Sequence, residues 1–102
     1  MLESRIQASS IARLRRAGWL VWPTGPANGQ ILDFHALSPH GVPWYVEVKQ
    51  PGKSPTREQL ITAQRIRNNR GRTLVLRRLS ELSVMLDDDT LARITTEGSS
   101  HA

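Results

Sequence analysis

Apolar and polar residues alternate along two short stretches in the middle of the chain. Within residues 31–37 and 43–48, nearly every other residue is apolar. The segment Ser38-Pro39-His40-Gly41 lies between the two stretches. Alternation of this kind predicts strands with one buried face, and proline and glycine in a short connection predict a hairpin. Gly41 is suited to the left-handed conformation that closes a three-residue turn. The sequence therefore predicts a β-hairpin over 31–48.

The turn also predicts how the two strands pair. If Ser38 lies opposite Val42, then Asp33 lies opposite Glu47. The alternation then assigns one set of residues to the core face: Leu32, Phe34, Ala36, Trp44, Val46 and Val48. The opposite face carries Asp33, His35, Tyr45, Glu47 and Lys49. All five side chains of this second face are ionisable.

Helical and strand patterns flank the hairpin, which predicts a single α/β domain over 1–94. The sequence predicts helices over 2–17, 56–70 and 81–86, a last turn to 94, and strands over 19–22 and 73–76. The strand over 19–22 is expected to be covered on both faces, and 23–29 to be a loop. The helix over 56–70 joins two strands, so a parallel pair is expected. The tail, 95–102, is expected to be disordered.

Composition narrows the classes of protein. The chain has 102 residues and no cysteine, so disulfides and thiolate metal sites are excluded and a reducing cytoplasm is compatible. No apolar run is long enough to span a membrane, so no membrane partner is expected. The net charge is +5, carried by twelve arginines and two lysines, and arginine suits bidentate phosphate contacts. Nucleic acid is therefore the leading partner class, with Lys53, Arg57, Arg65 and Arg70 as candidate phosphate contacts.

The predicted pairing brings two carboxylates together. Residues directly opposite each other on paired strands have Cβ atoms roughly 5 Å apart. The carboxylates of Asp33 and Glu47 would therefore repel each other, which costs stability. A hard cation removes this cost, because Mg²⁺ is held by one or two carboxylates together with water and phosphate. Lys49, on the same face, would orient a water or neutralise charge on a phosphate. The alternative is a solvated strand face with a Glu–Lys pair, and the spacing alone does not decide between the two.

Other polar and aromatic residues have two interpretations each. Glu3 falls on the apolar side of the first helix, either aimed at the same site as Asp33 or placed at the helix N-terminus for its dipole. Gln59 is either an active-site neighbour or part of a capping box with Thr56, and the pattern favours the cap. The tryptophans are interpreted as core residues rather than base-stacking platforms. The histidines lack zinc-ligand spacing.

Together these features resemble the PD-(D/E)XK nuclease superfamily, and more narrowly the small stand-alone VRR-NUC proteins often found in phages and prophages. The resemblance rests on Glu3, the run Gly18-Trp19-Leu20-Val21-Trp22, Gly29 before Asp33, the run Val46-Glu47-Val48-Lys49-Gln50-Pro51-Gly52-Lys53, and Pro55-Thr56 with Gln59. It spans roughly 3–82. Leu32 stands where the family usually has proline before the aspartate.

The resemblance implies a restriction-endonuclease-like fold, αβββαβ, with a mixed sheet flanked by helices. It also implies an endonuclease that hydrolyses DNA with Mg²⁺ or Mn²⁺. Carried over residue by residue, Asp33 and Glu47 would ligate the metal, with the Val48 carbonyl and Glu3 as further ligands. Lys49 would activate water and Gln59 would support the site. Similar stand-alone proteins act as homodimers on branched, Holliday-junction-like DNA, so both are expectations for this chain.

Two other functions remain open from the residues alone. One is a non-catalytic nucleic-acid-binding domain that uses the arginine-rich surface and is indifferent to Mg²⁺. The other is a subunit that keeps the nuclease fold and needs a partner for activity. The acid–acid–lysine set favours the nuclease over the binding domain.

Overall fold

The computed structural model describes residues 2–24 and 32–100, with side chains placed up to residue 95. The chain forms α1 (Glu3–Arg16), β1 (Leu20–Pro23), β2 (Phe34–Leu37), β3 (Pro43–Val48), α2 (Arg57–Asn68), β4 (Arg72–Leu76), a short 3₁₀ turn (Leu79–Leu82) and α3 (Ser83–Ser100). Most of the loop expected over 23–29, and Ile31 of the predicted strand, lie outside the described residues. The predicted α/β fold with a mixed sheet is confirmed.

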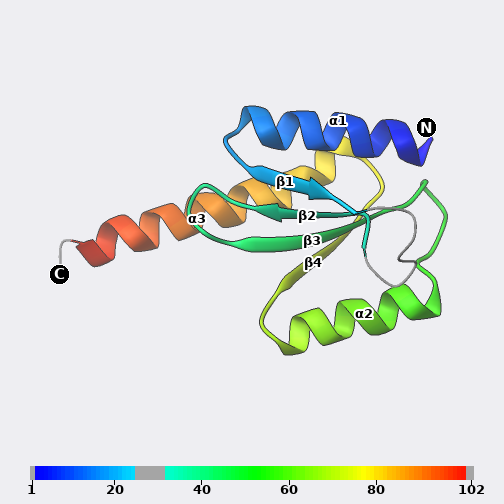
Figure 1. The fold of residues 1–102 in the computed structure, drawn as a ribbon. Helices are drawn as coiled ribbons and strands as arrows, with labels where there is room; N and C mark the ends of the chain where they lie inside the picture. The colour runs from blue at the N-terminus through cyan, green and yellow to red at the C-terminus, as the bar shows by residue number, and fades with distance from the viewer. Residues whose placement is uncertain (1, 25–31, 101–102) are drawn as a thin grey trace.

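The four strands form one sheet in the order β1-β2-β3-β4 (Figure 1). The first three strands are antiparallel, whereas β3 and β4 are parallel and are joined through α2. The hairpin has the predicted register: Phe34 pairs with Val46, and the Ser38 amide donates to the Val42 carbonyl at 2.9 Å. Gly41 has a φ of 82°, the left-handed conformation that the turn requires.

The two faces of the sheet are covered differently. α1 and the start of α3 pack on one face, and α2 packs on the other, against β3 and β4 (Figure 1). All six residues predicted for the core face of the hairpin are buried, and five of them belong to the main core cluster. The exception is Leu32, which lines a small cavity with Glu47 and residues of α2. Phe34 and Val46 are fully buried, and such side chains stabilise the fold by about 1.5–3 kcal/mol each. The opposite face therefore remains available for a site wherever α2 does not cover it.

The N-terminal third departs from the predictions at β1. β1 is an edge strand with one exposed face, so the prediction that it is covered on both faces is wrong: Leu20 and Trp22 are 56% and 52% exposed. In α1, Ser10 joins Ile6, Ile11 and Leu14 in the core, while Leu2 is exposed. Burial of Ser10 is tolerated because its hydroxyl donates to the Ile6 carbonyl at 2.6 Å.

The chain after β4 forms a 3₁₀ turn and one continuous helix, rather than the two short helices that were predicted. α3 runs through the triple aspartate to Ser100, and Figure 1 shows its C-terminal half extending beyond the sheet. Two of the three aspartates make tertiary contacts instead of capping a new helix. Asp88 pairs with Arg72 at 3.0 Å, and Asp89 binds the amide and ring of His40.

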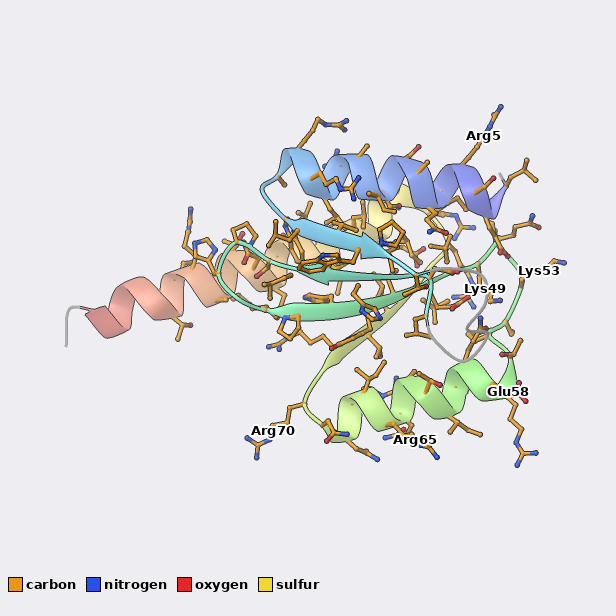
Figure 2. The ribbon with its side chains drawn as sticks, in the orientation of Figure 1. Arg5, Lys49, Lys53, Glu58, Arg65 and Arg70 are labelled. Carbon is orange, nitrogen blue, oxygen red and sulfur yellow. The ribbon has the colours of Figure 1, made fainter. Side chains whose placement is uncertain are left out.

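α2 begins at the predicted cap, because Thr56 and Gln59 form a capping box. Its side chains are largely exposed, and Arg65 and Arg70 lie on or next to its outer surface (Figure 2). Within the described residues, no helix is long and apolar enough to cross a membrane.

Candidate active site

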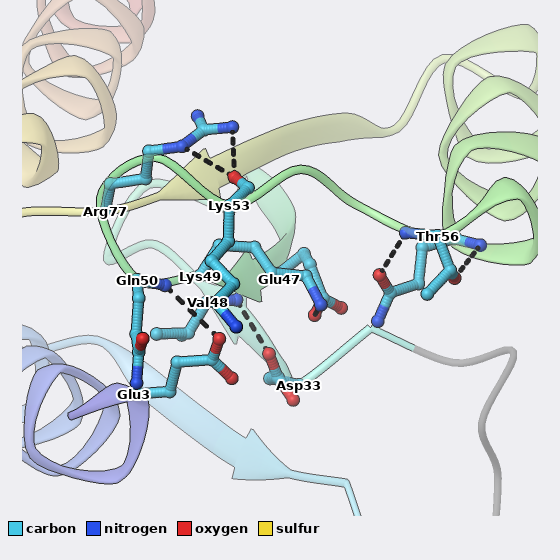
Figure 3. A network of polar contacts seen from close by, with 10 residues as sticks. Glu3, Asp33, Glu47, Val48, Lys49, Gln50, Lys53, Thr56 and Arg77 are labelled. Carbon is cyan, nitrogen blue, oxygen red and sulfur yellow. Dashed lines mark hydrogen bonds and ion pairs between the residues drawn. The ribbon is translucent and has the colours of Figure 1, made fainter.

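The two predicted carboxylates lie side by side on the face of the sheet opposite the main core (Figure 3). Glu47 is in β3, and Asp33 directly precedes β2, in continuation of the Phe34–Val46 pairing. The Asp33 carboxylate accepts a hydrogen bond from the Val48 amide at 2.7 Å, which ties the end of β2 to the end of β3. The hairpin register therefore positions both acids.

Glu47 is an unusual carboxylate because it is almost wholly buried. It is 4% exposed, and its Oε2 atom has no hydrogen-bond partner among the described residues. Burial, the neighbouring Asp33 carboxylate and a hydrogen bond shared with Asp33 raise the pKa of Glu47 to about 7, while Lys49 partly opposes this rise. Near neutral pH, Glu47 therefore tends to keep its proton unless a bound cation replaces the proton.

Lys49 completes the predicted set. Its Nζ atom lies 3.5 Å from Glu47 Oε1, and its side chain is largely shielded from solvent. Its backbone amide donates to the Leu76 carbonyl at 3.0 Å, which fixes this position against β4. The ammonium group is consequently held beside the carboxylate pair rather than free in solvent.

The backbone of Val48 faces the same side as Asp33. In an extended strand the N–H and C=O of one residue point the same way, and those of the next residue point the opposite way. Because the Lys49 amide bonds to β4, the Val48 groups point toward β2 and Asp33. Val48 lies beyond the last paired residues of β2 and β3, so its carbonyl is placed to accept a ligand.

Glu3 reaches the edge of this cluster from the first turn of α1. Its Oε1 atom accepts a hydrogen bond from the Gln50 amide at 3.2 Å (Figure 3). Arg77 holds the same loop, the one that follows Lys49, at a second point. Its guanidinium donates two hydrogen bonds to the Lys53 carbonyl at 3.0 and 3.2 Å. Glu3 thus positions the segment that follows Lys49.

Gln59 serves as the cap of α2. Its side-chain oxygen accepts from the Thr56 amide at 2.8 Å, and the Thr56 hydroxyl accepts from the Gln59 amide at 3.2 Å. Gln59 and Glu47 also line the same small cavity of about 50 Å³. Both interpretations of Gln59 therefore have a structural basis: it is a cap that also borders the site.

The donor set fits a hard divalent cation that is held partly by its own water. Among the residues described, no three His, Cys, Asp or Glu side chains form a group that could hold a metal. Asp33 and Glu47 supply two carboxylates, and Glu47 Oε2 is a buried oxygen with no hydrogen-bond partner in the described part of the chain. Mg²⁺ is commonly bound in this way, by one or two carboxylates with waters and substrate phosphate.

The basic residues divide into two groups by position. Lys53 lies near Lys49, in the loop that follows it (Figure 2). Arg5 lines a hollow with Gln50 and Pro51 of the same loop, although its exposed side chain points away from Lys49. Arg57, at the start of α2, is exposed. Arg65 and Arg70 instead lie near Gly71, at the opposite end of β4 from Lys49. Sequence reasoning missed Arg5, because its proximity to the loop depends on how α1 packs on the sheet.

Comparison with known proteins supports the same family. Neither protein-family models nor curated proteins give a match. A solved structure described as a VRR-NUC domain is similar, with 25% identity, a TM-score of 0.73, and coverage of 83% of this chain and 94% of that one. The fold and the carboxylate site thus define an α/β domain of the restriction-endonuclease-like class. Within that class the chain is similar to a VRR-NUC domain, which suggests a nuclease-type domain.

Proposed function

We propose that this protein is a metal-dependent endonuclease that hydrolyses the phosphodiester bonds of DNA with Mg²⁺ or Mn²⁺. The observation that carries the proposal is the buried carboxylate of Glu47 next to the half-buried carboxylate of Asp33, with Lys49 beside Glu47. Burying a carboxylate beside a second one costs free energy, so the arrangement calls for a function that offsets this cost. The likeness to a VRR-NUC domain supports DNA as the substrate.

In this proposal each residue of the site has a distinct role. Asp33, Glu47 and the Val48 carbonyl would hold the cation, and Glu3 would be an outer or additional ligand. A bound Mg²⁺ or Mn²⁺ would polarise the phosphate and lower the pKa of a bound water. Lys49 would donate hydrogen bonds to the attacking water or to a phosphate oxygen, which orients attack and stabilises the charge that develops in the transition state. Gln59 supports the site by fixing the start of α2 beside Glu47.

We further propose that the protein acts as a homodimer on branched DNA. α3 extends beyond the sheet and exposes Val84, Leu91 and Ile94, which are 50%, 64% and 53% exposed. Their spacing of seven and three residues places them on one side of the helix, as in helices that pair. Burying these side chains against a second α3 would give a molecule with two sites, which suits a junction with more than one strand to cut.

The test is cleavage of labelled four-way junction, flap, linear duplex and single-stranded DNA by the purified full chain. Each substrate is incubated with Mg²⁺, Mn²⁺ or EDTA and with wild type, Glu47→Gln or Glu58→Gln. Glu58 is the matched control, an exposed carboxylate in the first turn of α2 (Figure 2). Sedimentation of the same proteins reports whether they are dimers.

We expect metal-dependent cutting by wild type and Glu58→Gln, strongest on branched DNA. Removing a carboxylate that binds the metal should lower the rate by at least about 100-fold in Glu47→Gln. Equal cleavage by wild type and Glu47→Gln would overturn the assigned site. Tight binding without cutting by any variant would indicate a binding domain or a subunit that needs a partner.

A further inference from the structure

An aromatic row crosses the face of the sheet that carries the carboxylates, from the open edge strand β1 to the C-terminal end of α2. Trp22 of β1 pairs with His35 of β2, and His35 pairs with Tyr45 of β3. Paired residues point to the same face of a sheet, so the three rings lie in one row. His35 and Tyr45 meet edge to face, with ring centroids 4.7 Å apart.

Trp22 differs from the other two tryptophans in its exposure. Trp19 and Trp44 are 3% and 6% exposed and belong to the core, as predicted, whereas Trp22 is 52% exposed. β1 is the edge strand, and α2 covers the opposite half of this face, against β3 and β4. The expectation that all three tryptophans are core residues is therefore wrong for Trp22. An exposed indole costs free energy in solvent and gains most from stacking on a flat partner.

The row lies close to the proposed reaction centre. His35 and Tyr45 are each two residues along their strands from Asp33 and Glu47 on the same face. Two residues of a strand cover roughly 6.6 Å, about the length of one extended nucleotide. A DNA strand whose phosphate is bound at the carboxylates would therefore bring a neighbouring base over this row.

We propose that Trp22, His35 and Tyr45 form a stacking platform for one unpaired base adjacent to the phosphate that is cut. This inference rests on the proposed nuclease function and adds a basis for choosing the substrate. Aromatic side chains stack on any base face and read no sequence. In a continuous duplex both faces of each base are covered by neighbours. The platform consequently favours DNA with an unpaired or splayed base, such as a single strand, a flap or a branch point.

Binding in EDTA tests the platform without any need for cleavage. Fluorescence anisotropy is measured with labelled single-stranded DNA, an abasic strand of equal length and a linear duplex. Wild type is compared with Trp22→Ala and Trp22→Phe. Leu20→Ala is the matched control, an exposed apolar residue on the same face of β1. A stacked base contributes a factor of about 5 to 150 in affinity.

We expect Trp22→Ala to lose this factor on single-stranded DNA and nothing on the abasic strand or duplex. Trp22→Phe should recover most of the loss, and Leu20→Ala should bind as wild type does. Equal losses on normal and abasic strands, or an equal loss in Leu20→Ala, would overturn the platform. Unchanged DNA binding in Trp22→Ala would also overturn it and would point to a protein partner at this face.

Iodide quenching gives a second readout on the wild type. Trp22 is the exposed tryptophan, so iodide should quench mainly its fluorescence. Single-stranded DNA should protect it, whereas the abasic strand should not; equal protection by both would contradict the platform. Failure of the two proposals is distinguishable. Selective base stacking without cleavage would contradict the nuclease function and support the platform. Cleavage without a selective loss of binding in Trp22→Ala would support the nuclease function and contradict the platform.

Discussion

Glu47 links the stability of the protein to its chemistry. Its pKa is raised to about 7, from a model-peptide value of 4.5, by burial and by the adjacent Asp33 carboxylate. The folded protein therefore binds this proton more tightly than the unfolded chain. The stabilisation that the proton provides is complete below pH 4.5 and is lost as the pH rises through 7. Without metal, the site should strain the fold most at alkaline pH.

This difference predicts how Glu47→Gln behaves in thermal unfolding. In EDTA at pH 8, we expect Glu47→Gln to be more stable than wild type by up to about 3 kcal/mol, because the neutral amide removes the buried charge. At pH 4 the two proteins should be nearly equal. A stability difference that is the same at both pH values would contradict the prediction.

Added Mg²⁺ should stabilise wild type more than Glu47→Gln. At pH 8 it should raise the Tm of wild type, because a ligand that binds only the folded state stabilises it. Glu47→Gln should respond much less. Below pH 7 the affinity of wild type for Mg²⁺ should fall about tenfold per pH unit, since one proton competes for the same oxygens. Titration calorimetry between pH 5 and 8 measures this slope.

At the scale of elements, Gly71 determines how α2 meets the sheet. A Cβ atom at this position would lie 2.5 Å from Ile66 Cγ2 and 3.3 Å from Tyr45 Cε2. We expect Gly71→Ala to destabilise the fold by about 1–3 kcal/mol, because the crowded side chains must shift. Chemical denaturation measures the loss.

Ile66→Leu supplies the matched control for this prediction. Leucine has no branch at Cβ and therefore lacks the Cγ2 methyl that approaches Gly71, so the double variant Ile66→Leu/Gly71→Ala should recover part of the lost stability. The Ile66 carbonyl would remain 3.1 Å from the new Cβ, so recovery should be incomplete. A double variant that simply adds the two single losses would show that Ile66 is not the source of the strain.

The hairpin was predictable because two independent signals agree there. The turn residues fix the Ser38–Val42 pairing, and the alternation fixes which face is buried. Together they place Asp33 opposite Glu47 without knowledge of the rest of the fold. Thr56 and Gln59 were predictable for a similar reason, because a capping box is local in sequence. The core of the site thus depends on short-range features.

The features that were missed depend on distant contacts. Asp89 binds His40, which is 49 residues away in the chain, and Asp88 pairs with Arg72, so α3 continues where isolated aspartates suggested a break. The exposure of Trp22 depends on β1 lying at the edge of the sheet, which strand composition does not specify. Arg5 becomes a neighbour of Gln50 only when α1 packs on the sheet.

At the scale of the whole molecule, the basic residues are not equivalent. Arg5 and Lys53 lie at the loop that follows Lys49, whereas Arg70 precedes β4 at the end of the strand away from Leu76, which binds the Lys49 amide. A short substrate bound at the carboxylates would contact the first group. A long branched substrate has arms that can continue along α2 to the second.

This arrangement predicts how DNA affinity depends on salt. Arg5→Ala and Lys53→Ala should each weaken binding of short DNA and lower the salt slope by about 1, because each removes one phosphate contact. Arg65→Ala and Arg70→Ala should change the slope only on long branched DNA. Anisotropy titrations at several NaCl concentrations, on both substrates, measure these slopes. If Arg70→Ala weakened binding of short DNA as much as Arg5→Ala did, the bound strand would run along α2 rather than toward α1, because phosphate contacts act only where the backbone passes.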